Sequence, residues 1–212
     1  MNLSQAAFDQ MYDDGRLKIA LIGMSNIGKS YSALRLAADF DFTLIEVDKL
    51  IWEDLGESSM EDFAAWQGQP FSDGYAAREK VSIGLETQAT RRSLQTQVRN
   101  PLLDTTGSVI YTEPSVLRTL KAEWYTVYIK AADVHLERLK SQYFAQPKPL
   151  AWAGHFRKID GLSDSESLLE CYPDLLAARA EQYQALADHT VSSAAILTDS
   201  NDDLFKLIRP AT

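Results

Sequence analysis

The chain has 212 residues, of which 45% are hydrophobic and 24% are charged, and this composition is typical of a globular protein. That length accommodates one α/β domain with a sizeable core, and the sequence shows no internal repeat or linker. The formal net charge of −9 argues against non-specific binding to nucleic acid or to an anionic membrane, because these polyanions would be repelled.

The sequence shows no membrane span, no signal peptide and no pair of cysteines that could form a disulfide. No apolar run reaches the length of a membrane span, and the first ten residues lack the basic and apolar regions of a signal peptide. Cys171 is the only cysteine, so no intrachain disulfide can form, and we interpret it as a small apolar residue. We therefore expect a cytoplasmic protein with one domain over residues 1–212.

A short helix is predicted over residues 3–13, with Ser4 as a plausible N-cap and an apolar stripe on one face. We interpret residues 1–16 as an accessory structural helix that packs across the edge of the domain. An apolar, β-branched run over residues 17–22 then predicts a buried strand.

The residues after this strand spell G-x-x-x-x-G-K-S, the pattern of a phosphate-binding P-loop. Gly23 and Gly28 permit backbone angles that other residues avoid, so the loop N–H groups can surround phosphate oxygens. Lys29 would reach the β- and γ-phosphates, and the Ser30 hydroxyl would ligate Mg²⁺. A helix predicted over residues 29–39 would direct its positive end at the same anion. The predicted ATP-binding residues are Gly23, Met24, Ser25, Asn26, Ile27, Gly28, Lys29, Ser30 and Tyr31.

Two carboxylates follow the next predicted strand, residues 42–47. Glu46 and Asp48 are two residues apart, so on an extended segment their side chains point to the same side. There they could serve Mg²⁺ through water and hold a substrate hydroxyl. A solvated strand end with Asp48 as a helix cap is an equally simple reading, which the nearby P-loop makes less favourable.

A second acidic signal lies at Asp104, which ends a short apolar strand over residues 102–103. An aspartate in this position downstream of a P-loop has the form of a Walker B carboxylate that holds Mg²⁺. Residues 105–107, Thr-Thr-Gly, then offer hydroxyls and backbone N–H groups at the end of the strand; a polar turn is the alternative.

The remaining pattern alternates helices with strands. Helices are predicted at residues 49–69 with a turn at Gly56, 75–98, 115–122, 132–143, 165–187 with an interruption at Pro173, and 202–208; further strands are predicted at 124–130 and 190–196. This alternation predicts a three-layer α/β sandwich of the P-loop NTPase class, with a parallel sheet covered by helices on both faces. Residues 144–160, which contain two prolines and a glycine, are predicted to form a mobile lid loop.

The order of these features resembles the shikimate kinase family, small P-loop kinases related to nucleoside monophosphate kinases, from about residue 17 to residue 208. Residues 23–30 match the family P-loop, and residues 46–51 resemble its D-x-D-x-x-I motif. Residues 105–107 stand where the family has three glycines, and residues 179–183 are similar to its R-x-P-L-Y segment.

This resemblance implies ATP and Mg²⁺ as cofactors, with Ser30, Glu46 and Asp104 at the metal. It also implies that Asp48 orients the reacting hydroxyl. The implied substrate-binding residues are Asp48, Arg78, Thr106, Gly107 and Arg179, of which the two arginines would hold an anionic group. Arg138 would lie against the adenine, and the implied catalytic residues are Lys29, Asp48 and the lid residue Lys148.

The sequence departs from the family pattern at three places. Two of the three glycines are threonines, the lid arginine is replaced by Lys148, and Val81 stands where a glutamate should follow Arg78 by three residues. Lysine cannot make the bidentate contact that arginine makes, although His155, Arg157 and Lys158 could substitute on a longer lid.

We therefore expect an ATP-dependent kinase of a small hydroxylated molecule, with a small-molecule partner and an oligomeric state that the sequence does not indicate. A related kinase of another substrate, such as a sugar acid or a nucleoside, is one alternative. A regulatory protein that binds ATP without transferring phosphate is another. The sequence contains no N-K-x-D segment, which disfavours a GTPase.

Overall fold

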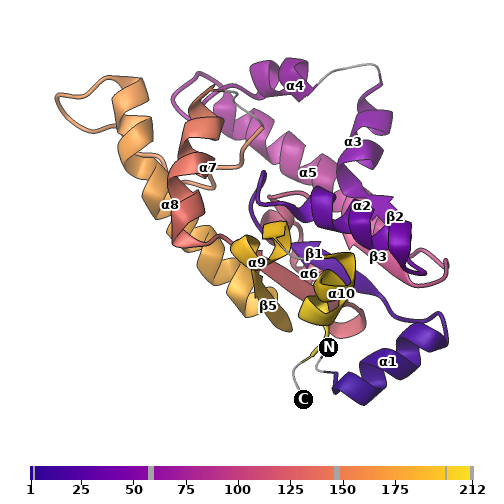
Figure 1. Ribbon diagram of the computed structural model, residues 1–212. Helices are drawn as coiled ribbons and strands as arrows, with labels where there is room; N and C mark the ends of the chain where they lie inside the picture. The colour runs from indigo at the N-terminus through magenta and orange to yellow at the C-terminus, as the bar shows by residue number, and fades with distance from the viewer. Residues whose placement is uncertain (2, 57–59, 146–148, 199, 211–212) are drawn as a thin grey trace.

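The computed structural model describes residues 1, 3–56, 60–145, 149–198 and 200–210. Within them, five parallel strands form one sheet in the order β2-β3-β1-β4-β5, with β1 at its centre (Figure 1). The strands are β1 (Ile19–Ile22), β2 (Thr43–Glu46), β3 (Pro101–Asp104), β4 (Tyr125–Lys130) and β5 (His189–Ser192). The predicted parallel α/β sheet is therefore confirmed.

The central strands are buried on both faces. All four residues of β1 are fully buried, and every residue of β3 is buried as well. Strands that are covered on both sides have continuous apolar sequences, which explains why these segments were readable from the sequence. Each fully buried Leu or Ile in this core stabilises the fold by roughly 1.5–3 kcal/mol.

Helices cover both faces of the sheet, as predicted. Helix α2 (Lys29–Asp39) follows β1 and leads toward β2, and it packs with α10 (Asn201–Ile208). Helices α5 (Tyr75–Leu94), α6 (Pro114–Glu123) and α8 (Asp164–Leu186) lead in the opposite direction across the sheet. Because crossovers between parallel strands are right-handed, helices that lead in opposite directions lie on opposite faces.

Further helices extend from one end of this sandwich (Figure 1). They are α3 (Val47–Leu55), α4 (Met60–Gln67) and α7 (Asp133–Ala145), and the predicted turn at Gly56 ends α3. A separate buried cluster joins α5, α7, α8 and residue Trp152, and it includes Tyr75, Tyr143 and Tyr172. This cluster holds the helices that stand around the site.

The N-terminal helix α1 (Gln5–Asp13) begins as predicted, because the Ser4 hydroxyl accepts a hydrogen bond from the N–H of Ala7 at 3.3 Å. Phe8 is fully buried and contacts Tyr125 edge-to-face and Phe205. The helix thus packs on the core of the domain. None of the described helices is long and apolar enough to cross a membrane.

Three local predictions were wrong. Strand β2 ends at Glu46 and the chain turns at once into α3, so Asp48 is helical instead of extended. Pro173 does not interrupt α8, because buried neighbours on both sides, including Leu175, offset the cost of a proline inside a helix. Strand β5 ends at Ser192, and the apolar residues after it form a short helix, α9 (Ser193–Thr198), since such a short run fits either structure.

Candidate functional site

The loop between β1 and α2 has the geometry that its sequence predicts. Gly23 has a φ of 144°, and a Cβ added there would lie 2.7 Å from the carbonyl oxygen of Ile129. Gly28 has a φ of 109° and immediately precedes α2. Both positions therefore require glycine. Ile27 is 1% exposed, so its side chain anchors the loop in the core.

Lys29 is the first residue of α2 and is buried except for 6% of its surface. Its ammonium donates hydrogen bonds to the carbonyl oxygens of Gly23 at 3.0 Å and Met24 at 2.9 Å. The charge is thus held over the loop, next to the N-terminal end of a helix. Both features favour a bound anion such as a phosphate group.

Asp104 lies beside this loop and is 5% exposed. Its Oδ1 atom has no hydrogen-bond partner among the described residues. Burial raises the pKa of the Asp104 carboxyl, whereas the Lys29 ammonium and a hydrogen bond from Ser30 lower it. An orphaned carboxylate oxygen beside a hydroxyl suits Mg²⁺, which prefers oxygen ligands, so Ser30 and Asp104 fit this metal.

Glu46 stands next to Asp104 in the sheet, because the two residues are partners in the pairing of β2 with β3. Its side chain forms an ion pair with Lys49. Among the described residues, no cluster of three or more His, Cys, Asp or Glu could hold a metal. A magnesium ion here would therefore take most of its ligands from phosphate oxygens and water, as is usual for this metal.

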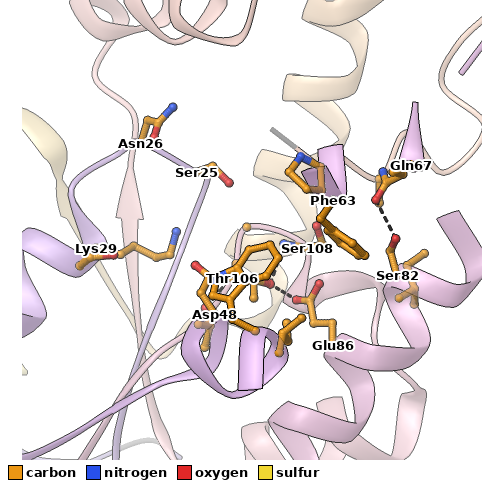
Figure 2. A pocket seen from close by; sticks show the side chains of 18 of the residues that line it. Ser25, Asn26, Lys29, Asp48, Phe63, Gln67, Ser82, Glu86, Thr106 and Ser108 are labelled. Carbon is orange, nitrogen blue, oxygen red and sulfur yellow. Dashed lines mark hydrogen bonds between the residues drawn. The ribbon is translucent and has the colours of Figure 1, made fainter. Parts of the chain in front are cut away.

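The P-loop opens into a cavity of about 470 Å³. Figure 2 shows two opposite sides of this cavity, with Asp48 and Thr106 between them. On the first side lie Ser25, Asn26 and Lys29. On the second side lie Phe63, Gln67, Ser82 and Glu86. Together with Ile83, which lines the cavity from the same helix α5, these residues form what we call the α4–α5 wall.

Asp48 reaches the cavity from the first turn of α3, directly after β2. The turn from strand to helix therefore brings the Asp48 carboxylate to the cavity, as the expected extended segment would have done. It places a carboxylate at the carboxyl edge of the sheet, where ligands of parallel α/β proteins bind.

The loop after β3 faces the P-loop at very close range. A Cβ added to Gly107 would lie 2.6 Å from the Ser25 hydroxyl and 3.0 Å from the Ser25 backbone nitrogen. A side chain at this position would therefore force Ser25 and the P-loop backbone to shift. The carbonyl oxygen of Gly107 accepts hydrogen bonds from Tyr183 and from the Arg179 guanidinium.

The two threonines that replace glycines form hydrogen bonds with other residues of the protein through their hydroxyls. Thr105 donates to the carbonyl oxygen of Leu21 at 2.8 Å, which ties the loop to β1. The Thr106 hydroxyl donates to the Glu86 carboxyl and accepts from the N–H of Ser108 at 3.1 Å. Both threonines line the cavity, so they narrow it without blocking it.

Glu86 is the principal residue that sequence reasoning missed. It is 5% exposed, lines the cavity from α5, and has its pKa raised to about 8 by burial and by the nearby Asp48 carboxylate. The Arg179 and Lys29 charges act in the opposite direction. Helix α5 carries polar residues on all sides, so no periodic signal distinguishes this glutamate from solvated ones.

The described part of the predicted lid is bound to the rest of the protein. The side chains of Gln67 and Tyr75 both donate to the carbonyl oxygen of Leu150, at 2.9 Å and 2.7 Å. Trp152 is 1% exposed, and its backbone N–H donates to the Glu79 carboxylate at 2.5 Å. Residues 149–153 therefore form a roof over the cavity, which Pro149 and Ala151 line.

Several predicted site residues do not line the cavity. Arg78 donates to the carbonyl oxygen of Gln67 at 3.0 Å, where it caps the end of α4. Arg138 is exposed on α7. Arg179 is 1% exposed behind the loop after β3. Lys148 lies outside the described residues, and Arg157 and Lys158 form exposed ion pairs, so neither substitutes for it in the cavity.

No protein-family model matches the sequence, and neither does any curated protein. Solved structures do resemble this one. Shikimate kinase from Acinetobacter baumannii in complex with shikimate aligns with a TM-score of 0.62 and 19% identity over 94% of each chain. The fold is that of a shikimate-kinase-like P-loop protein.

Two further shikimate kinases agree with this assignment. The enzyme from Bacteroides thetaiotaomicron has a TM-score of 0.56 and 14% identity over 91% of this chain and 94% of its own. The enzyme from Aquifex aeolicus has a TM-score of 0.52 and 17% identity over 90% and 92%. Within this shikimate-kinase-like fold, the P-loop and Asp48 line one cavity and Asp104 lies beside the P-loop, whereas three of the predicted arginines do not line this cavity.

The close approach of Gly107 to Ser25 gives a first prediction. Gly107→Ala forces the P-loop to shift, so we expect the free energy of unfolding to fall by about 1–3 kcal/mol and Mg·ADP binding to weaken about tenfold or more. Calorimetry and denaturant unfolding would measure both. Gly84→Ala is the matched control, because a Cβ at this helical position meets nothing within 4 Å; unchanged binding in Gly107→Ala would contradict the argument.

The buried Glu86 carboxyl gives a second prediction. Its pKa is raised to about 8 in the folded protein, so the folded state holds a proton that the unfolded state has lost, and stability falls as pH rises from about 5 to 8. Glu86→Gln has no such proton. The free energy of unfolding of the variant should therefore rise relative to that of the wild type by at most about 1.4 kcal/mol for each pH unit in this window.

Denaturant unfolding between pH 5 and pH 9 would measure this difference. The exposed Glu170→Gln variant on α8 serves as the control for a glutamate that lies outside the cavity. A difference between Glu86→Gln and the wild type that stays constant over the whole range would show that burial does not control this carboxyl.

Proposed function

We propose that this protein is an ATP-dependent phosphotransferase that acts on a hydroxyl group of a small molecule. The observation that carries the proposal is that one cavity joins a P-loop, with Lys29 over it, to the Asp48 carboxylate, which lies between the P-loop and the α4–α5 wall. A second, buried carboxylate, Asp104, lies beside the P-loop, and its Oδ1 atom has no hydrogen-bond partner among the described residues. A protein that only hydrolysed or sensed nucleotide would not need the additional wall and roof.

The nucleotide would bind on residues 23–31, with its phosphates at the P-loop and at the start of α2. Ser30 and Asp104 would hold Mg²⁺, and Glu46 would support it through water. When bound, this ion neutralises charge on the phosphate oxygens. The Lys29 ammonium would stabilise the same developing charge from the side of the loop. Arg138 remains the proposed neighbour of the adenine.

Asp48 would orient the attacking hydroxyl and accept its proton. Its position in the first turn of α3 suits this role, because it faces the cavity between the P-loop and the α4–α5 wall. A positioned carboxylate base contributes typically 10²–10⁴-fold to the rate of such a reaction.

The roof formed by residues 149–153 would exclude water, which otherwise competes with the acceptor for the phosphoryl group. Its hydrogen bonds to Gln67, Tyr75 and Glu79 support this role. Lys148 precedes the roof and remains the proposed lid cation. The structural neighbour from Acinetobacter baumannii binds shikimate, which supports a hydroxylated small-molecule acceptor. A cytoplasmic location, as expected from the sequence, would suit a reaction that consumes ATP.

The proposal predicts that Lys29→Ala abolishes phosphoryl transfer while the fold is retained. Without the ammonium, the developing charge on the phosphate oxygens loses its main protein contact, so ADP release should fall by 10³-fold or more, in proportion to about 4 kcal/mol of transition-state stabilisation. The assay measures ADP release with Mg·ATP and a panel of hydroxylated acceptors, and circular dichroism checks the fold.

Lys80→Ala removes an exposed lysine from α5 and is the matched control. Wild-type-like turnover in Lys29→Ala would overturn the proposed role of the P-loop. Tight ATP binding by the wild type with no phosphorylated product from any acceptor would instead indicate a protein that binds ATP without transferring phosphate.

A further inference from the structure

The cavity has an uneven distribution of charge. Among the lining residues that the structure describes, Lys29 is the one cation, and it lies on the side of the P-loop. Asp48 and Glu86 carry carboxyl groups and lie in the first turn of α3 and on the α4–α5 wall. The part of the cavity away from the P-loop therefore has two carboxyl groups and no cation among its described lining residues.

The arginines that could have balanced these acids are engaged elsewhere. Arg78 binds the carbonyl oxygen at the end of α4. Arg179 donates to the carbonyl oxygens of Gly107 and Ala151 at 3.2 Å and 2.7 Å and is 1% exposed, so an anion could reach it only by displacing the loop or the roof. Its charge acts on Glu86 from behind the loop after β3, but it offers no accessible donor.

Ile83 occupies the position one helical turn before Glu86 and lines the cavity. A cationic side chain at this position would face the acceptor directly. An apolar residue there offers no cation to a bound carboxylate, and burying such a charge without a partner is strongly unfavourable.

Aromatic rings complete the same wall. The Phe63 side chain points into the cavity (Figure 2). Its ring is supported edge-to-face by Trp52, with centroids 5.6 Å apart, and is stacked on Trp66 at 5.3 Å. A rigid, supported ring of this kind favours a ligand with a flat or apolar face.

We propose that the acceptor is a hydroxylated ring compound without an acidic group, neutral or carrying an amine, whose flat face packs on Phe63 and whose hydroxyls meet Asp48, Thr106 and Glu86. Nucleosides and neutral or aminated sugars have this chemistry, whereas hydroxylated carboxylic acids do not. This inference rests on the proposed function only in calling the ligand a phosphoryl acceptor. The preference for ligands without an acidic group is a property of binding and can be tested without turnover.

The experiment measures binding by calorimetry in the presence of Mg²⁺ and a non-hydrolysable ATP analogue, so that it does not depend on turnover. Two matched sets vary only the charge of the ligand. The first set is shikimate and its methyl ester, and the second is glucuronate, glucose and glucosamine. Adenosine and cytidine test the flat face. ADP release with ATP is measured separately for each compound.

We expect the ester, the neutral or aminated sugars or the nucleosides to bind at least tenfold more tightly than the matching carboxylates. Ile83→Arg places a cation one turn from Glu86 and should reduce or reverse this preference. Ile83→Met, which changes the side chain without adding charge, should not improve the binding of the carboxylates. Phe63→Ala should weaken the binding of the nucleosides more than the binding of glucose.

The proposal is overturned if the wild type binds a carboxylate as well as or better than its neutral counterpart. It is also overturned if no neutral or aminated compound of the panel binds. Failure of the proposed function gives a different result, because the order of binding would then be as expected while no compound stimulates ADP release.

Discussion

The two central strands β1 and β3 end side by side, and both loops of the site begin at these ends. The loop after β3 approaches the P-loop so closely that a Cβ at residue 107 would force Ser25 to shift. Thr105 then ties this loop to β1, while Arg179 and Tyr183 hold the Gly107 carbonyl from α8. This contact fixes where Asp104, the P-loop and Glu86 lie relative to one another, and the rest of the site depends on it.

The site also keeps several ionisable groups out of water. Lys29, Asp104, Glu86 and Arg179 are each at most 6% exposed. Burial of such groups is costly unless they are paired, and here the pairing is incomplete, since the Oδ1 of Asp104 has no partner among the described residues. The polar cavity therefore lowers the stability of the fold, as is typical of sites that bind charged ligands.

The parts of the site that depend on local sequence could be predicted, and those that depend on packing could not. The P-loop and α2 follow from a strand, a motif and a helix that are adjacent in the chain, and Asp104 follows from the short apolar strand that it ends. Whether Glu86 is buried depends on α3, α4 and the loop after β3, which are distant in sequence. Arg78 matched a family position in sequence, yet its Nε donates to the backbone carbonyl oxygen of Gln67, one of the carbonyls that a helix end leaves without a partner in the helix.

The measurement that tests the site most directly is the Mg²⁺ dependence of ADP binding, by calorimetry, in the wild type and in Asp104→Asn. If the P-loop and Asp104 form one metal–nucleotide site, the wild type binds one ADP per chain, Mg²⁺ raises its affinity at least tenfold, and most of this gain is lost in Asp104→Asn. If the wild type binds no ADP, or binds it equally well without Mg²⁺, the orphaned carboxylate is not a metal ligand and the cavity is not the nucleotide site described above.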